Sequence, residues 1–115
     1  MDVITTLTKY PNQLHTLVLE NNNSADIKLF YNARMQSWFI NINFEEISIN
    51  GLKIVLHPNL LRQFRKILPF GLMIYAESDF VEPFEIEAFS SGRVKIGILN
   101  SDEVEEVETE IYNNA

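Results

Sequence analysis

The stretch KLFYNARMQSWFINI, residues 28–42, places two apolar segments on either side of a short polar turn. Apolar residues alternate in both segments, which indicates two neighbouring antiparallel strands at 26–32 and 37–44. One face of this ribbon carries Ile27, Leu29, Tyr31, Trp38, Ile40 and Ile42. Phe30 and Phe39 point to the opposite face, where a small domain usually meets water. The ribbon is therefore apolar on both faces, and the second face needs a cover.

Two kinds of cover fit this pattern. Either a helical segment or a second sheet of the same chain packs on Phe30 and Phe39, or the two rings lie in a subunit interface, where aromatic residues are enriched. Each ring left in water forgoes about 2 kcal/mol of burial. The sequence leaves both explanations open, and Phe30 and Phe39 are candidate interface residues of a homo-oligomer.

Further strands are expected along the chain. A first strand is predicted near 13–20, and a buried strand is predicted at LMIYAES, residues 72–78. Asn50-Gly51 lies between apolar segments and predicts a type I′ hairpin. A second hairpin is predicted over 83–99, with Glu85 opposite Lys95 and Glu87 opposite Arg93.

The segment HPNLLRQFRKILPFG, residues 57–71, breaks the strand rhythm. Its apolar residues recur at helical spacing and Asn59 is a candidate N-cap, which predicts a short helix or helical loop. With about seven strands and this one helical connection, the chain reads as mainly β, a small antiparallel β-barrel or sandwich. We expect a single β domain at 1–100 and an acidic tail at 101–115.

Charge is unevenly distributed around the net value of −7, since eleven of the 16 acidic residues lie from Glu77 onward. This acidic field disfavours nucleic-acid binding and favours a basic protein partner. Arg62, Arg65 and Lys66 would share one face of the predicted helix. That patch is a phosphate-contacting patch, a solvated helix face or a docking site for an acidic neighbour, such as the tail of another copy.

The tail itself has a helical pattern. Val104, Val107 and Ile111 fall on one stripe, and Asn100 with Glu103 resembles a capping box. The stripe is thin and the acidic residues are many, so the tail is either disordered alone or a helix docked on something. Its three apolar residues are further candidate contacts.

The sequence contains few residues that could take part in catalysis or bind a metal or cofactor. The chain has no cysteine, no glycine-rich phosphate loop, no apolar segment long enough for a membrane span and no signal-peptide pattern. His15 and His57 lie far apart and are read as polar surface or strand-end residues. Glu85 and Glu87 share a predicted strand face but have basic neighbours. We expect no enzyme, no cofactor and no metal; a small carbohydrate- or ligand-binding β-barrel, with Tyr31, Trp38 and Tyr75 lining its pocket, is the alternative to an assembly protein.

Residues about 11–99 resemble the phage baseplate plug proteins. The similar motifs are PNQLHTLVL, the Tyr31-Asn32 turn followed by Trp38, Gly51 with LLRQF, LPFG before an apolar strand, and RVKIGIL. The extra residues in FEEISINGLKI and the acidic tail depart from the family pattern. The resemblance implies a non-enzymatic virion subunit at the centre of a contractile-tail baseplate, assembled in the host cytoplasm with hub, spike and tube proteins and without a cofactor.

Overall fold

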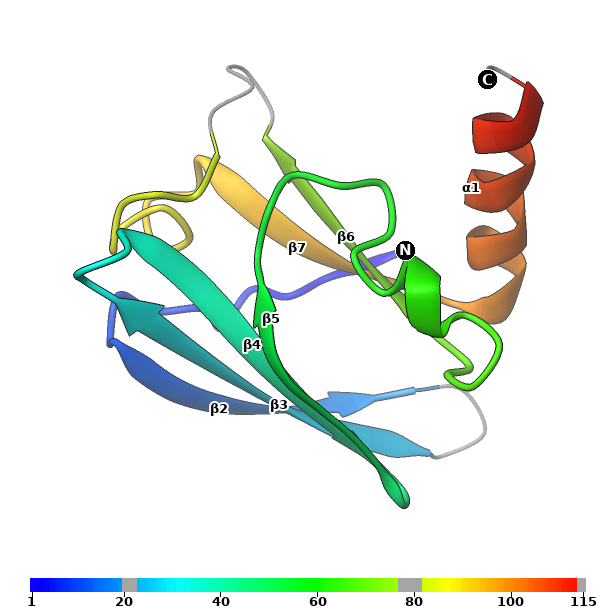
Figure 1. Cartoon of the computed structure of the whole chain (residues 1–115), viewed down its shortest axis with the longest axis horizontal. Helices are drawn as coiled ribbons and strands as arrows, with labels where there is room; N and C mark the ends of the chain where they lie inside the picture. The colour runs from blue at the N-terminus through cyan, green and yellow to red at the C-terminus, as the bar shows by residue number, and fades with distance from the viewer. Residues whose placement is uncertain (20–22, 77–81, 114–115) are drawn as a thin grey trace.

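Two antiparallel sheets pack face to face in the structure, a computed structural model that describes residues 1–19, 23–76 and 82–113 (Figure 1). One sheet has the strand order β2-β3-β4-β5 and the other β1-β7-β6. The strands are β1 (Asp2–Val3), β2 (Asn12–Val18), β3 (Ser24–Asn32), β4 (Ser37–Phe44), β5 (Ile47–Lys53), β6 (Gly71–Ala76) and β7 (Val94–Leu99). The predicted mainly β, antiparallel fold is confirmed as a sandwich. Among the described strands the sheets do not close into a barrel, because β2 and β5 remain edges.

The β3–β4 ribbon supplies the centre of the core. Leu29 pairs with Ile40 and Tyr31 with Trp38, as expected for the two strands predicted at 26–32 and 37–44. The inward side chains of these strands are fully buried and face those of β6 and β7. They are Ile27, Leu29, Trp38, Ile40 and Ile42 on the ribbon, and Leu72, Ile74, Val94 and Ile96 on the second sheet.

The predicted hairpin at Asn50-Gly51 is wrong. The chain turns at Glu45 and Glu46, since Phe44 pairs directly with Ile47, and Glu45 takes the positive φ of 53°. Gly51, at φ 72°, instead forms a β-bulge within β5, and its N–H donates to Asn41 Oδ1 at 2.7 Å. A bulge adds one residue and so shifts the inward positions from odd to even numbers, which mimics the pattern of a turn.

The second predicted hairpin, over 83–99, is also wrong, because residues 84–93 form turns and no strand. Ala88 N–H donates to the Glu85 carbonyl and Ser91 N–H to the Glu87 carbonyl, which are turn-like bonds within the segment. β7 pairs instead with β6, where Ile74 lies opposite Ile96, and with β1. Arg93 forms an ion pair with Glu85, not with the expected Glu87.

The helical connection is a 3₁₀ turn, η2 (Arg62–Phe64). Asn59, which is 2% exposed, precedes it, and its Oδ1 accepts from the N–H of Leu61 and of Leu72, each at 3.1 Å. One buried amide therefore joins the helical segment to β6. Gly71 lies against this amide, because a Cβ at position 71 would be 2.5 Å from Asn59 Oδ1.

We predict that Gly71→Ala lowers the free energy of unfolding by about 2 kcal/mol or more, because the new methyl displaces Asn59 and leaves two buried N–H groups without an acceptor. Denaturant unfolding measures this change. Gly97→Ala is the matched control on the neighbouring strand. The atoms nearest to its methyl would belong to the flexible Met1 side chain, so a smaller loss is expected. Equal losses in the two variants would contradict the role given to Asn59.

Candidate functional site

The second face of the central ribbon carries a stacked aromatic pair. Phe30 and Phe39 are direct register partners, and their ring centroids lie 5.6 Å apart at an interplanar angle of 18°. Both side chains are half-buried, and both lie outside the core between the sheets. The second sheet packs on the other side of the ribbon. The second sheet therefore does not cover Phe30 and Phe39, which was one of the two explanations left open by the sequence.

The same face of the sheet continues onto β2. We use the term outer face for the side chains of the four-stranded sheet that point away from the second sheet: Asn12, Leu14, Thr16, Val18, Ser24, Asp26, Lys28, Phe30, Phe39, Asn41, Asn43, Ser48 and Lys53. Leu14 and Val18 are 70% and 75% exposed. The Thr16 hydroxyl donates to Asp26 Oδ1 at 2.8 Å. Polar and apolar side chains thus alternate along β2, and the aromatic pair lies in the row of Asn12. This mixture of apolar and polar groups suits contact with another protein.

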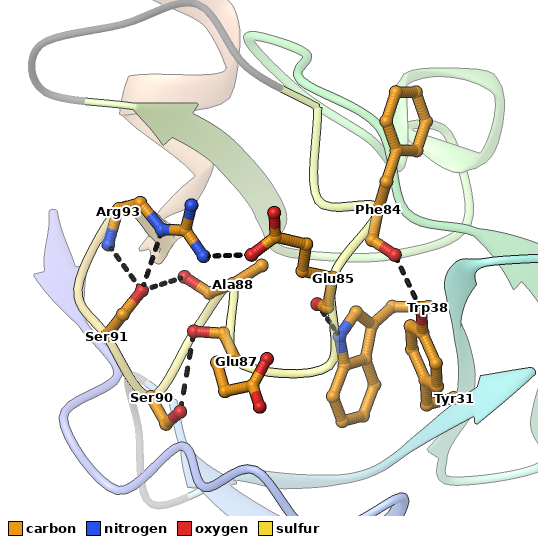
Figure 2. Close-up of polar contacts among 9 residues, drawn as sticks. All are labelled: Tyr31, Trp38, Phe84, Glu85, Glu87, Ala88, Ser90, Ser91 and Arg93. Atoms are coloured by element: carbon orange, nitrogen blue, oxygen red, sulfur yellow. Dashed lines mark hydrogen bonds and ion pairs between the residues drawn. The ribbon is translucent and has the colours of Figure 1, made fainter. Parts of the chain in front are cut away.

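Tyr31 and Trp38 fasten the 84–93 segment to the end of the ribbon (Figure 2). The Tyr31 hydroxyl donates to the Phe84 carbonyl at 2.6 Å, and Trp38 Nε1–H donates to the adjacent Glu85 carbonyl at 3.1 Å. Trp38 is fully buried, and Phe89 packs edge-on against it with ring centroids 5.6 Å apart. We call Tyr31 and Trp38 together the aromatic latch.

The latch gives the Tyr31-Asn32…Trp38 motif a structural role. Asn32 Oδ1 accepts from the Met35 N–H at 3.0 Å and so shapes the turn between the two latch residues. Since Trp38 is buried in the core, it offers no ring face to a ligand. This burial argues against the carbohydrate-binding alternative, which requires Tyr31, Trp38 and Tyr75 around an open pocket.

The acidic tail forms a helix, α1 (Ser101–Asn113), beside the end of β7 (Figure 1). The predicted capping box is confirmed: Glu103 N–H donates to Asn100 Oδ1 at 2.8 Å, and Asn100 N–H donates to Glu103 Oε1 at 3.1 Å. The Met1 amine also pairs with Glu103 Oε2 at 2.7 Å. This ion pair raises the pKa of the amine and lowers that of the Glu103 carboxyl.

The basic patch meets this helix within one chain. Arg62 donates from Nε and Nη2 to both oxygens of Glu108 at 3.0–3.2 Å, and Arg65 Nε lies 3.8 Å from Glu108 Oε1. The Arg62 guanidinium lowers the pKa of the Glu108 carboxyl. The acidic neighbour anticipated for Arg62 and Arg65 is thus the tail of the same molecule.

The remaining candidates near this contact lie on the same two segments, the helical connection and α1. Lys66 is exposed on the helical connection, whereas Val104 and Val107 are half-buried on α1. Ile111 belongs to α1, but its side chain is outside the part of the chain that the structure describes. The structure therefore separates the candidates into two surfaces. One is the outer face, and the other, which we call the α1 region, consists of α1 with the helical connection that contacts it.

The polar candidates serve structural contacts. His15 Nε2 lies 2.7 Å from Gln13 Oε1, and its Nδ1 lies 3.1 Å from the Thr6 hydroxyl, while burial lowers the His15 pKa. His57 Nδ1 accepts from the Asn59 N–H at 2.9 Å. Within residues 1–19, 23–76 and 82–113 no three histidine or acidic side chains converge as metal ligands. In the same ranges no helix has the length and apolar character that crossing a bilayer would require.

Removing the indole donor should loosen the latch. We predict that Trp38→Phe lowers the free energy of unfolding by about 1–3 kcal/mol, because the Glu85 carbonyl loses a partly buried donor. Tyr31→Phe should cost about 1 kcal/mol, because its bond to Phe84 is more exposed. Denaturant unfolding and amide exchange of residues 84–93 measure both effects. Tyr10→Phe, at an exposed tyrosine, is the control; unchanged exchange in Trp38→Phe would contradict the latch.

Helix α1 should be held most firmly between about pH 5 and pH 8. The folded pKa values of Glu103 and Glu108 lie below the ordinary 4.5, so their contribution is present above that value and is lost as the pH falls through the folded pKa. The folded pKa of the Met1 amine lies above 8.0, so its contribution is lost as the pH rises through that pKa. Amide exchange of α1 across pH, corrected for intrinsic rates, measures both limits.

Two variants separate the two limits. Glu108→Gln should make the protection of α1 depend less on pH in the acid range. Acetylation of the Met1 amine should abolish the loss of protection at alkaline pH. Exchange in β6 is the internal control, since its bonds do not involve these groups. Protection of α1 that stays constant from pH 3 to pH 10 would show that ion pairs do not hold the helix.

Comparison with known proteins assigns the chain to a protein family. None of the curated proteins compared with it matches. A family model described as cyanophage baseplate Pam3 plug gp18 matches residues 1–101, which span both sheets, the aromatic latch and the helical connection. The match ends where α1 begins, so most of the acidic helix lies beyond it. The chain belongs to the phage baseplate plug family.

Proposed function

We propose that this protein is a structural subunit of a contractile-tail baseplate, placed as a plug where tube, hub and spike meet, and that it acts only through protein–protein contacts. The family match over residues 1–101 is the observation that carries the proposal. In this role the protein needs no cofactor and no catalytic group. It resides in the tail of the virion after assembly in the host cytoplasm.

The chemistry of the described residues supports a non-enzymatic role. Glu85 is exposed, and its side chain forms an ion pair with Arg93. Glu87 points away from this pair in Figure 2.

The outer face supports assembly. Phe30 and Phe39 form the centre of a row across the sheet that ends in Asn12 on β2 and Lys53 on β5. An aromatic centre with a polar rim is the usual composition of a protein–protein interface. The partners we propose are other baseplate proteins of the hub, spike or tube and further copies of the chain.

The α1 region offers a second surface of opposite character. Glu108 is occupied by Arg62 and Arg65, but Glu105, Glu106 and Glu110 are exposed on the helix. Exposed carboxylates of one sign would steer a basic neighbour toward this side of the molecule and increase its association rate.

We predict that Phe39→Asp abolishes incorporation into tails while the purified protein stays folded, because the new charge lies on the outer face and outside the core. Incorporation is measured by complementing a phage that lacks the gene and quantifying the protein in purified virions. Ser48→Asp, on the same face at β5, adds the same charge away from the rings and should incorporate normally.

Circular dichroism and thermal unfolding of the purified variants separate assembly from folding. An unfolded Phe39→Asp protein would mean that the pair stabilises the monomer, and Phe30→Asp then repeats the test at the register partner. Normal incorporation of both folded variants would overturn the role of the outer face.

A further inference from the structure

Strand β2 is an edge of the four-stranded sheet, and its sequence NQLHTLV contains no charged residue and no proline. Natural proteins usually protect such an edge with lysine, proline, a bulge or a covering segment. β2 pairs with β3 without a register shift over its full length, so it carries no bulge. It is seven residues long and lies along one side of the sandwich (Figure 1).

The hydrogen-bonding pattern shows which groups of β2 face outward. Tyr31 N–H donates to the Pro11 carbonyl, and Leu19 N–H donates to the Asn23 carbonyl. Bonded pairs alternate along an antiparallel ladder, so the odd-numbered residues of β2 bond to β3. The N–H and C=O groups of Leu14, Thr16 and Val18 therefore point away from the sheet, and no hydrogen bond of the described residues occupies them.

The other edges are protected. The outer edge of β6 is covered by the 57–60 segment, where His57 and Ile74 exchange two backbone hydrogen bonds and Leu60 N–H donates to Leu72. β5 carries the bulge at Gly51 and ends in Lys53. β1 is only two residues long and begins beside the charged amine. β2 is thus the edge best suited to add a strand.

The side chains of β2 are complementary to themselves. Leu14 and Val18, the two most exposed apolar residues of the outer face, lie symmetrically on either side of Thr16. We infer that a second copy of this chain pairs with β2 antiparallel, with a two-fold axis at Thr16. In this register Leu14 of each copy lies opposite Val18 of the other, and Thr16 lies opposite its own equivalent.

This pairing would join two four-stranded sheets into one continuous sheet of eight strands. The outward N–H and C=O groups of Leu14, Thr16 and Val18 bond across the axis, and both apolar pairs lose water. Asp26, the charged residue bonded to Thr16, lies one strand further in, so the two copies of Asp26 are about 14 Å apart, three strand spacings. At physiological salt that distance exceeds the Debye length of about 8 Å.

The inference rests on the proposed assembly role, since it names one surface and one partner, a second copy, for it. Light scattering of the purified chain tests it directly. We expect a concentration-dependent species of about twice the chain mass of 13.3 kDa. Leu14→Lys should convert it to monomer, because the lysine would lie opposite Val18 at the paired edge. Ser48→Lys, which adds the same charge to the outer face at the opposite edge, should leave the dimer unchanged.

A cross-link tests the register. The chain has no cysteine, so Thr16→Cys introduces a single thiol. Bonded antiparallel partners have Cα atoms about 5.5 Å apart, within the range of about 4.4–6.8 Å that a disulfide spans. Mild oxidation should therefore produce a covalent dimer from Thr16→Cys at concentrations where Ser48→Cys, an exposed thiol on β5, stays monomeric.

Three outcomes would overturn the inference: a monomer at every concentration, an assembly that Ser48→Lys dissolves and Leu14→Lys does not, or equal cross-linking of the two cysteine variants. A monomer in which Leu14→Lys blocks incorporation into tails would assign the edge to a different baseplate protein and not to a second copy. A dimer that never enters tails would leave this pairing intact and contradict the proposed function instead.

Discussion

The burial of Trp38 is the interaction on which the rest of the structure depends. Its ring fills the space between the two sheets and contacts Tyr31 on one side and Phe89 on the other, with ring centroids 5.3 and 5.6 Å away. An indole can be buried there only because its N–H finds an acceptor, the Glu85 carbonyl. The same bond fixes the 84–93 segment over the end of the core. One side chain thereby joins the ribbon to the 84–93 segment.

With the inward face of the ribbon used in this way, the outward face remains outside the core, and we propose it as a contact surface. The stacked Phe30 and Phe39 rings, the exposed Leu14 and the open backbone of β2 all belong to one sheet, on the side and edge that the second sheet does not reach. Charge is arranged on a different part of the molecule, where α1 presents carboxylates and neutralises Arg62 and Arg65. In the proposed assembly, the apolar and the acidic surface would contact different neighbours.

The acidic helix illustrates how a weak local signal becomes a defined structure. Val104 and Val107 provide only a thin apolar stripe, which would not hold an isolated 13-residue helix. The capping box starts the helix, the Met1 amine binds its first turn through Glu103, and Arg62 binds its middle through Glu108. The family match ends at residue 101, so most of this helix lies outside the matched part of the chain.

The sequence by itself determined the strands at 26–32 and 37–44, the faces on which their side chains lie, the described part (72–76) of the buried strand predicted at 72–78, and the capping box at Asn100 and Glu103. These features depend on contacts between near neighbours in the chain, which alternation and spacing report. Tertiary structure alone decided the turn at Glu45-Glu46, the bulge at Gly51 and the irregular 84–93 segment. A bulge and a turn both shift the parity of apolar positions, so local pattern cannot distinguish them. Apolar and charged residues alternate in the 84–93 segment as they would in a strand. Its Phe84 and Glu85 carbonyls nevertheless accept hydrogen bonds from Tyr31 and Trp38, more than 40 residues away. β7 pairs with β6 instead.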